Sequence, residues 1–245
     1  MINRLISRFN RYKNNYSKKQ IFNDQFETFK RNDINCKLSC ERADIYPCLN
    51  DNTNITEFDA HYIYHPAWAA RIIKSLNPTE HTDISSILYF STILSAFLPV
   101  KFYDYRPAEV SLSGLKSEKI DLTNLFFEDN SIESLSCMHT IEHIGLGRYG
   151  DQIDPDGDIK AINEIKRVVK KGGSILFVVP VGNPKIMFNA HRIYDPIMII
   201  DFFSGYSLKE FSLITDDGQF INGAPLSLGK TQTYGCGCFW FIKNT

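Results

Sequence analysis

Short apolar runs alternate along the chain with segments whose apolar residues recur at helical spacing. Runs typical of strands lie near residues 81–87, 100–105, 117–122, 132–138, 174–182, 208–216 and 236–243. Helices are expected near residues 58–78, 88–98, 157–173 and 196–205. Strands that alternate with helices favour an α/β fold with a doubly wound, mostly parallel sheet of seven strands. The last strand is expected to pair antiparallel at or near an edge.

The first part of the chain, residues 1–56, lacks this alternation and is rich in Asn and Lys. We expect an N-terminal extension or cap there, with a helix over the first thirty residues, and an α/β domain at 57–245. Basic side chains gather near the start, among them Arg4, Arg8, Arg11 and Lys13. They fit either a solvated extension or a peripheral contact with an anionic membrane surface.

Charge and composition argue against several classes of protein, namely nucleic-acid binders, membrane-spanning proteins and disulfide-rich secreted proteins. The 27 Lys and Arg residues nearly balance the 28 Asp and Glu residues, whereas a dedicated nucleic-acid binder usually carries a basic excess. No stretch approaches the roughly 18 apolar residues that span a bilayer, and the N-terminus has no apolar signal core. The six cysteines show neither a zinc spacing nor a disulfide framework. We therefore expect a cytoplasmic protein without a transmembrane segment or a nucleic-acid partner; its oligomeric state stays open.

Acidic residues follow two of the expected strands. In a doubly wound sheet, ligands bind beyond the carboxyl ends of the strands. Asp104 ends the expected second strand and Asp121 ends the third. A carboxylate in the first position suits both ribose hydroxyls of a nucleoside, and one in the second suits an adenine amine. The sequence therefore predicts a nucleoside site at this edge of the sheet.

Several motifs resemble those of class I S-adenosylmethionine-dependent methyltransferases, namely "KIDLTNLFFEDNSIESLSCMHTIEHIG" and "DIKAINEIKRVVKKGGSILFVVPVG". More narrowly, "HYIYHPAWAARII", "LSCMHTIEHIGLGRYGD" and "FNAHRIY" resemble the DUF268 family, which is often linked to surface-polysaccharide genes. The resemblance covers roughly residues 58–245 and implies the cofactor S-adenosyl-L-methionine, with a sugar or another small polar molecule as methyl acceptor. The residues that it assigns to the cofactor are Asp83, Ser85, Ser86, Asp104, Arg106, Asp121, Leu122 and His139.

One turn departs from the pattern of these methyltransferases. They usually carry a glycine-rich turn after the first strand, whereas this chain has no glycine between Pro78 and Gly114. In the matching turn, "DISSILYFST", Ser85 and Ser86 are expected to donate hydroxyl groups at a helix N-terminus, beside amides that favour a carboxylate. Their side chains also restrict a close approach of the cofactor. A non-catalytic, methyltransferase-like binding or scaffold protein is therefore the alternative to an enzyme.

His139, Glu142 and His143 have the H-x-x-E-H spacing of an inverted zinc-peptidase motif. A zinc site of this kind needs the motif inside a helix, so that both imidazoles lie on one face. Here a strand-like run precedes the motif, and glycines follow it at positions 145, 147 and 150. We therefore expect a strand-exit loop that holds no metal, and a zinc hydrolase is the less favoured alternative.

The exit loop is expected to lie beside the methyl acceptor. Glu142 or His143 would face the acceptor, since an imidazole with a pKa of about 6.5 is a suitable base for a hydroxyl nucleophile. A backbone hydrogen bond at a loop corner is the structural alternative for His143. His191, after the fifth expected strand, is the second candidate base.

The acceptor is expected to touch the exit loop and the segment after the fifth strand. The residues proposed for this contact are Arg148, Tyr149, Asp151, Asn189 and Arg192. Arg192 has two interpretations: it pairs with a phosphate or carboxylate on the acceptor, or with a nearby acid such as Asp195.

Overall fold

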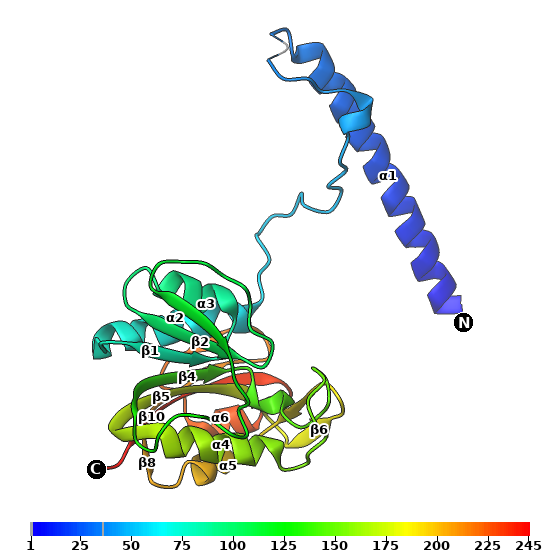
Figure 1. The fold of residues 1–245 in the computed structure, drawn as a ribbon. Helices are drawn as coiled ribbons and strands as arrows, with labels where there is room; N and C mark the ends of the chain where they lie inside the picture. The colour runs from blue at the N-terminus through cyan, green and yellow to red at the C-terminus, as the bar shows by residue number, and fades with distance from the viewer. Residues whose placement is uncertain (1, 36) are drawn as a thin grey trace. The chain divides into compact units, whose positions relative to one another are not determined.

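The computed structural model describes residues 2–35 and 37–245, with side chains described from residue 16 onward. The chain forms two compact units, Met1–Glu57 and Phe58–Thr245 (Figure 1). The second unit contains every strand of the described chain.

The Met1–Glu57 unit consists of a long helix, α1 (Ile2–Asn32), and a short 3-10 helix, η1 (Arg42–Asp44). The expected N-terminal helix is therefore present. Lys30 at the end of α1 binds the segment that follows the helix. Its Nζ donates to Cys40 O at 2.9 Å and lies 3.4 Å from Glu41 Oε1. The side chains of Arg4, Arg8, Arg11 and Lys13 lie outside the described residues, so the membrane contact remains a prediction. None of the described helices is long and apolar enough to cross a bilayer.

The Phe58–Thr245 unit is built on an eight-stranded sheet in the order β3-β2-β1-β4-β5-β10-β8-β9. Its strands are β1 (His81–Ile84), β2 (Val100–Asp104), β3 (Leu115–Lys119), β4 (Ile132–Met138), β5 (Val169–Val181), β8 (Tyr206–Ile214), β9 (Phe220–Ile221) and β10 (Gly235–Lys243). The first five strands in this order are parallel neighbours, and β10 is antiparallel to both β5 and β8. The predicted doubly wound, mostly parallel sheet is confirmed.

The last strand was expected to pair antiparallel at or near an edge. β10 does pair antiparallel, and it lies between β5 and β8, with the two-residue β9 beyond β8 at the edge. Its residues Cys236, Cys238 and Phe239 are fully buried, as an interior strand requires. The edge on this side is the two-residue strand β9, which the sequence did not predict and which raises the count from seven to eight.

The boundary between helix α4 (Gly157–Val168) and strand β5 also differs from the expected helix at 157–173. Val169 already pairs with Ile132 of β4, and the next pair joins Ser174 to Ser134. The intervening residues therefore bulge out of the ladder. Gly173 permits this bulge, since a Cβ there would lie 2.8 Å from Lys170 O. The double glycine marks a strand irregularity rather than a helix end.

Helices cover both faces of the sheet (Figure 1). They are α2 (Ala60–Leu76), α3 (Leu88–Leu94), α4, α5 (Pro196–Phe202) and α6 (Leu226–Lys230). Trp68 of α2 and Phe90 of α3 belong to the core on one face, whereas Ile165 of α4 and Ile199 of α5 belong to the core on the other. With both faces covered, the carboxyl edge of the parallel strands is the place for a polar site.

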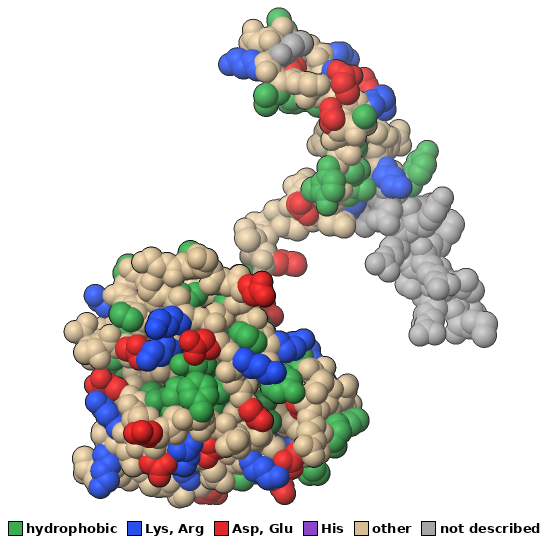
Figure 2. All heavy atoms as spheres, viewed as in Figure 1, with side chains coloured by type: hydrophobic (Ala, Val, Ile, Leu, Met, Phe, Trp, Pro, Cys, Tyr) green, Lys and Arg blue, Asp and Glu red, His purple; other side chains and the backbone are tan. Residues whose placement is uncertain are grey.

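The surface of this unit carries charges of both signs. On the face seen in Figure 2, Lys and Arg side chains are interspersed with Asp and Glu side chains around small apolar areas. Such mixing is typical of a solvated protein surface.

Candidate functional site

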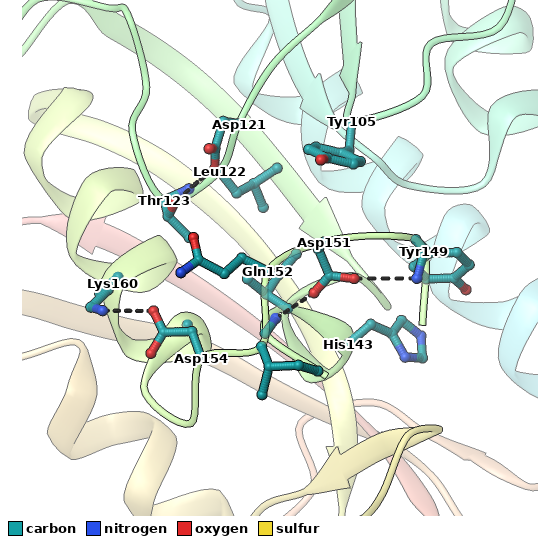
Figure 3. A pocket seen from close by; sticks show the side chains of 14 residues that line it. Tyr105, Asp121, Leu122, Thr123, His143, Tyr149, Asp151, Gln152, Asp154 and Lys160 are labelled. Carbon is teal, nitrogen blue, oxygen red and sulfur yellow. Dashed lines mark hydrogen bonds and ion pairs between the residues drawn. The ribbon is translucent and has the colours of Figure 1, made fainter. Parts of the chain in front are cut away.

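A cavity of about 590 Å³ opens at the carboxyl edge of the parallel strands. Residues after β2 and β3, the loop after β4 and the start of α4 form its wall (Figure 3). The residues that line it include Tyr105, Asp121, Leu122, His143, Tyr149, Asp151 and Lys160. Tyr105, Gln152 and Lys160 were missed at the sequence level; the position of Tyr105 directly after a strand-end acid was the available signal.

The two predicted nucleoside acids, Asp104 and Asp121, form matching turns. Asp104 Oδ1 accepts from the Arg106 amide at 2.7 Å. Asp121 Oδ1 accepts from the amide and hydroxyl of Thr123 at 2.8 and 2.7 Å. Each turn fixes its carboxylate through one oxygen and leaves Oδ2 for a ligand. Asp121 and the buried Leu122 line the cavity, while Asp104 is half-buried at the end of β2.

Two guanidinium groups lie over the Tyr149 ring. The Arg106 guanidinium lies 4.5 Å from the centre of the Tyr149 ring, and that of Arg148 lies 5.2 Å from it. These cation–π contacts link the end of β2 to the exit loop. Arg106 thus fixes Tyr149 at the cavity rather than lining the cavity itself.

Asp151 organises the exit loop. Its Oδ2 accepts from the amides of Gly145 at 2.7 Å and Gly147 at 3.3 Å, and its Oδ1 accepts from the Tyr149 amide at 3.2 Å. Partial burial would raise the pKa of this carboxyl, but these amides outweigh it and lower the pKa. Gly145 has a φ of 79°, and a Cβ there would lie 2.0 Å from Asp154 O, so the loop requires glycine.

Asp83 lies in the core and does not line the cavity, contrary to its expected role in cofactor binding. The residue is fully buried, and its carboxylate accepts from Ser136 Oγ at 2.6 Å and from Ser91 Oγ. Ser136 in turn contacts His81 Nε2 at 2.8 Å. Burial raises the pKa of Asp83 to about 6 despite these hydroxyl groups, and burial lowers the pKa of His81 to about 3. The difference arises because β1 is buried along its whole length and continues to Ile84, so Asp83 lies inside the sheet rather than beyond the end of the strand.

Ser85 and Ser86 occupy the turn after β1, but both hydroxyls are used within the protein. Ser85 adopts a left-handed φ of 56°, and its amide and Oγ both donate to Tyr103 O, at 2.7 and 3.2 Å. Ser86 Oγ is buried and accepts from the Met138 amide at 3.2 Å. The expected donation of both hydroxyls to a cofactor carboxylate is therefore corrected: the turn packs against β2 and β4.

The H-x-x-E-H segment is a strand exit followed by a 3-10 turn. His139 comes directly after β4 with a left-handed φ of 56°, and η2 spans Ile141–His143. His139 Nδ1 donates to Glu142 Oε1 at 2.8 Å, and both side chains are almost fully buried. The helical zinc clamp is excluded, because the motif does not lie in an α-helix and the two histidines contact the carboxylate between them.

His143 lines the cavity with a defined tautomer. Its Nδ1 lies 2.6 Å from Ala190 O, and a carbonyl only accepts, so Nδ1 carries the proton. Nε2 therefore holds the lone pair and lies 3.9 Å from Glu142 Oε1. Arg148 Nη1 donates to the same Ala190 carbonyl at 3.1 Å. The backbone bond foreseen for His143 is present, and it leaves the second ring nitrogen available.

An unpredicted hairpin, β6 (Lys185–Met187) and β7 (His191–Ile193), carries the other candidate residues. Asn189 is exposed at its turn. His191 is half-buried, its ring 4.8 Å from that of Tyr234, and burial lowers its pKa.

Arg192 serves the structure rather than an acceptor. The side chain is almost completely buried; it donates to Ile144 O at 2.6 Å and Pro155 O at 3.1 Å, and lies 3.4 Å from Asp158. Its expected contact with an acceptor anion is therefore wrong, and its acid partner is Asp158 instead of Asp195. Asp195 caps α5 and pairs with Lys230.

Side chains from α2 and β10 join the exit loop, and sequence reasoning did not connect them. The His61 ring stacks between those of His139 and Tyr234, with 5.4 Å between centres on each side. Burial and then the neighbouring His139 lower the pKa of His61 to about 4. Burial also raises the pKa of Cys236 and, to about 12, that of Tyr234. Only tertiary contacts bring these distant residues together.

Comparisons with known proteins support the family resemblance. The family model described as "Caenorhabditis protein of unknown function, DUF268" matches residues 116–227. An uncharacterized protein of Methanocaldococcus jannaschii is 31% identical over 94 residues. That match covers 36% of this chain and 36% of the relative, so the chain spans little more than a third of the relative's length.

Solved structures share the fold at low sequence identity. The N-methyltransferase NodS from Bradyrhizobium japonicum, in complex with S-adenosyl-L-homocysteine, has a TM-score of 0.53 at 11% identity, over 74% of this chain and 86% of that one. The 1,6-didemethyltoxoflavin-N1-methyltransferase of Burkholderia thailandensis has a TM-score of 0.51 at 10% identity, over 74% and 79%. The [4+2]-cyclase SpnF has a TM-score of 0.51 at 10% identity, over 74% and 81%. These likenesses show the fold.

The strand order, the layered helices and these comparisons agree. Residues 116–227 thus match the DUF268 family model, and they lie within a unit whose Rossmann-like fold is similar to that of solved class I S-adenosylmethionine-dependent methyltransferases.

Proposed function

We propose that this chain is an S-adenosyl-L-methionine-dependent O-methyltransferase that acts on a sugar or another small polar acceptor. The observation that carries the proposal is the cavity at the carboxyl ends of the parallel strands, with Asp121 and Leu122 on its wall together with His143 of the exit loop. NodS, which shares the fold, was solved with S-adenosyl-L-homocysteine. Ligands of doubly wound sheets bind in this position.

The residues that line this cavity, together with Asp104 at the adjacent end of β2, fit the nucleoside of the cofactor. Oδ2 of Asp104 suits the ribose hydroxyls and Oδ2 of Asp121 suits the adenine amine, since the other oxygen of each carboxylate is occupied by its turn. Tyr105 and Leu122 follow these acids directly and line the cavity, where they offer aromatic and apolar surface to a base. Acidic and apolar groups thus alternate at the same edge.

The cofactor, when bound, supplies a methyl group on a positively charged sulfur. The chain has to align the acceptor and remove one proton from its hydroxyl group. His143 is the proposed base, because Nδ1–H is fixed on Ala190 O and Nε2 is left to accept the proton. Glu142 stabilises the imidazolium that forms, from 3.9 Å. His191, half-buried beside Tyr234, is the second candidate.

The acceptor is proposed to contact Arg148, Tyr149 and Asn189, whose side chains are exposed around the exit loop and the hairpin turn. Asp151 supports this contact by holding the loop. A sugar acceptor and a role in surface-polysaccharide biosynthesis rest on the DUF268 resemblance.

Transfer of a radiolabelled methyl group to a panel of monosaccharides and nucleotide sugars tests the proposal. Label should enter one class of hydroxylated acceptor. His143→Gln should lower the rate by roughly 100-fold or more, as loss of a general base does, while binding of S-adenosyl-L-homocysteine persists. Equal transfer by the wild type and His143→Gln would assign proton removal elsewhere, and transfer to none of the acceptors would remove the sugar proposal.

The turn at Ser85 favours a second candidate, a non-catalytic binding or scaffold protein. A side chain stands at a left-handed φ where these enzymes usually have glycine, and the hydroxyls of Ser85 and Ser86 are used internally. The likeness to the [4+2]-cyclase SpnF also illustrates that one fold serves different activities. If this candidate is right, neither the wild type nor Ser85→Gly will bind S-adenosyl-L-homocysteine.

The proposal also covers the domain boundaries of the chain and its location in the cell. We propose residues 57–245 as the methyltransferase-like domain and residues 1–56 as an extension or cap. The described cysteines Cys40, Cys48, Cys137, Cys236 and Cys238 are free thiols, which supports a cytoplasmic location.

A further inference from the structure

Three metal-binding side chains from distant parts of the sequence meet where β4 ends. His61 comes from the first turn of α2, His139 from the residue after β4, and Cys236 from the start of β10. One ligand atom of each lies within 4.8 Å of the ligand atoms of the other two. His139 was expected to contact the cofactor, but none of these three side chains lines the cavity in which the methyl transfer is proposed.

His139 presents a nitrogen that the described chain leaves unsatisfied. Nδ1–H donates to Glu142 Oε1, so the lone pair lies on Nε2. Nε2 is buried without a hydrogen-bond partner in the described structure, and the side chain is only 4% exposed. A buried polar atom without a partner costs free energy, and native proteins rarely keep one without a reason. A metal ion would satisfy this lone pair.

Glu142 prepares His139 as a metal ligand. Histidines that bind metals typically donate their other ring N–H to a carboxylate or carbonyl, which fixes the tautomer and makes the ligating nitrogen more basic. The 2.8 Å bond to Glu142 has this arrangement. His143 does not belong to the set, because among the described residues only His61, His139 and Cys236 form the group whose ligand atoms lie within 4.8 Å of one another.

Of the other two ligands, Cys236 is fixed in the sheet and His61 is half-buried with its ring stacked. The His61 ring stacks between His139 and Tyr234, 5.4 Å from each. Cys236 is fully buried on β10, where the backbone pairs on both sides with β5 and β8. Zinc bonds of about 2.0–2.3 Å require the three side chains to draw together, which rotation of the half-buried His61 allows.

We propose that His61, His139 and Cys236 bind one thiophilic divalent transition metal, with zinc as the ion that best fits two imidazoles and a thiolate. Three protein ligands leave the fourth tetrahedral position open, as in zinc sites that bind a further ligand. Binding converts the thiol to a thiolate and releases its proton to solvent. The site goes beyond the proposed methyl transfer and stands without it.

Cobalt titration of the full chain, first stripped with a chelator, tests this proposal. Cobalt reports on its own ligands: one equivalent should produce a thiolate-to-metal charge-transfer band and the visible bands of a tetrahedral site, and zinc should displace it. S-adenosyl-L-homocysteine binding is measured separately on the same samples, so failure of the metal site and failure of the proposed function are distinguished.

Single substitutions show which side chains bind the metal. Cys236→Ser should abolish the charge-transfer band, and His61→Gln or His139→Gln should weaken binding by at least about 100-fold. Glu142→Gln should weaken it by about 10–100-fold, the usual effect of removing the partner of a ligating histidine. Cys137→Ser is the control, since Cys137 is equally buried but belongs to the core on the other face of the sheet.

Circular dichroism establishes that each variant is folded before titration. Absence of stoichiometric cobalt or zinc binding to the folded wild type would overturn the proposal. Binding that persists unchanged in both Cys236→Ser and His61→Gln would overturn it as well, because the metal would then sit elsewhere.

Discussion

Glu142 accepts a hydrogen bond from His139 across 2.8 Å, and the two side chains are only 1% and 4% exposed. Glu142 also lies 3.9 Å from the second histidine, His143. A buried carboxylate between two imidazoles stabilises a positive charge on either ring, because water screens little there. The exit loop therefore holds a charge-stabilising group directly behind the cavity that contains His143.

Replacement of Glu142 by glutamine should separate chemistry from binding. The amide keeps the shape of the side chain but loses its charge, so the imidazolium form of His143 is no longer stabilised. We expect the rate of methyl transfer to fall by roughly 100-fold or more, whereas the Kd for S-adenosyl-L-homocysteine changes by less than about threefold. Single-turnover kinetics and calorimetry measure the two quantities.

Glu133→Gln is the matched control, because Glu133 lies on β4 and pairs with Lys170 at the surface. It should leave both values unchanged. A Glu142→Gln enzyme with wild-type turnover would show that the carboxylate plays no part in proton removal.

Asp121→Asn should weaken cofactor binding. The amide retains one oxygen for the turn with Thr123 but replaces the free carboxylate oxygen with a neutral donor. A hydrogen bond to a charged group contributes about 1.5–3 kcal/mol, so the Kd should rise by roughly 10–150-fold. Asp217→Asn, at an exposed turn, should leave the Kd unchanged. An unaltered Kd in Asp121→Asn would place the adenine amine elsewhere.

Arg192→Ala should act on stability. Removal of this buried cation leaves two backbone carbonyls without their donor and leaves Asp158 with only the Tyr194 hydroxyl. Breaking a buried ion pair typically costs about 3–5 kcal/mol. Denaturant unfolding of the variant measures this loss. Arg71→Ala, on the exposed side of α2, should cost less than about 0.5 kcal/mol. If Arg192→Ala keeps wild-type stability and raises only the KM for an acceptor, Arg192 is an acceptor ligand after all.

Asp83 should make the stability depend on pH. Its folded-state pKa of about 6 exceeds the ordinary value of 3.8, so folding favours the protonated form. The carboxyl group therefore contributes most at low pH, and its contribution decreases as the pH rises through 4 to 6. In Asp83→Asn, which does not titrate, the unfolding free energy relative to wild type should increase by about 2 kcal/mol between pH 4.5 and pH 7.5.

Chemical denaturation of both proteins at the two pH values checks this, and each comparison is made at one pH so that other groups cancel. His81 acts in the opposite direction, because burial lowers its pKa to about 3 and it destabilises the fold as the pH falls from 6.5. A stability difference that does not change with pH would mean that Asp83 is ionised in the folded protein over this range.

Much of the fold was predictable because local patterns agree with the tertiary structure. β4 begins and ends at the expected residues, and Asn77 with Pro78 ends α2 as the helix-stop signal predicts. The end of α4 was not predictable, since Val169 to Gly173 continue a helical pattern until pairing with Ile132 overrides it. The interior position of β10 is likewise set by a partner strand distant in sequence.

The site was predictable only where a residue's position along a strand determines its role. Asp121 lies at the cavity because strand ends share one edge of the sheet. Asp83 was expected at the end of a strand, but β1 continues to Ile84 and all of its residues are buried, so Asp83 lies inside the sheet. Arg192 looked available because a loop was expected, whereas β7 and the exit loop bury it. The meeting of His61 with Cys236 has no local signal.

Calorimetric titration of the full chain with S-adenosyl-L-homocysteine tests the central claim most directly. Binding of one equivalent, weakened in Asp121→Asn and unchanged in Asp217→Asn, is the predicted result. No detectable heat at about millimolar ligand with the folded wild type, confirmed by an unshifted Tm at the same concentration, would contradict the proposal and leave a methyltransferase-like fold that binds no such cofactor.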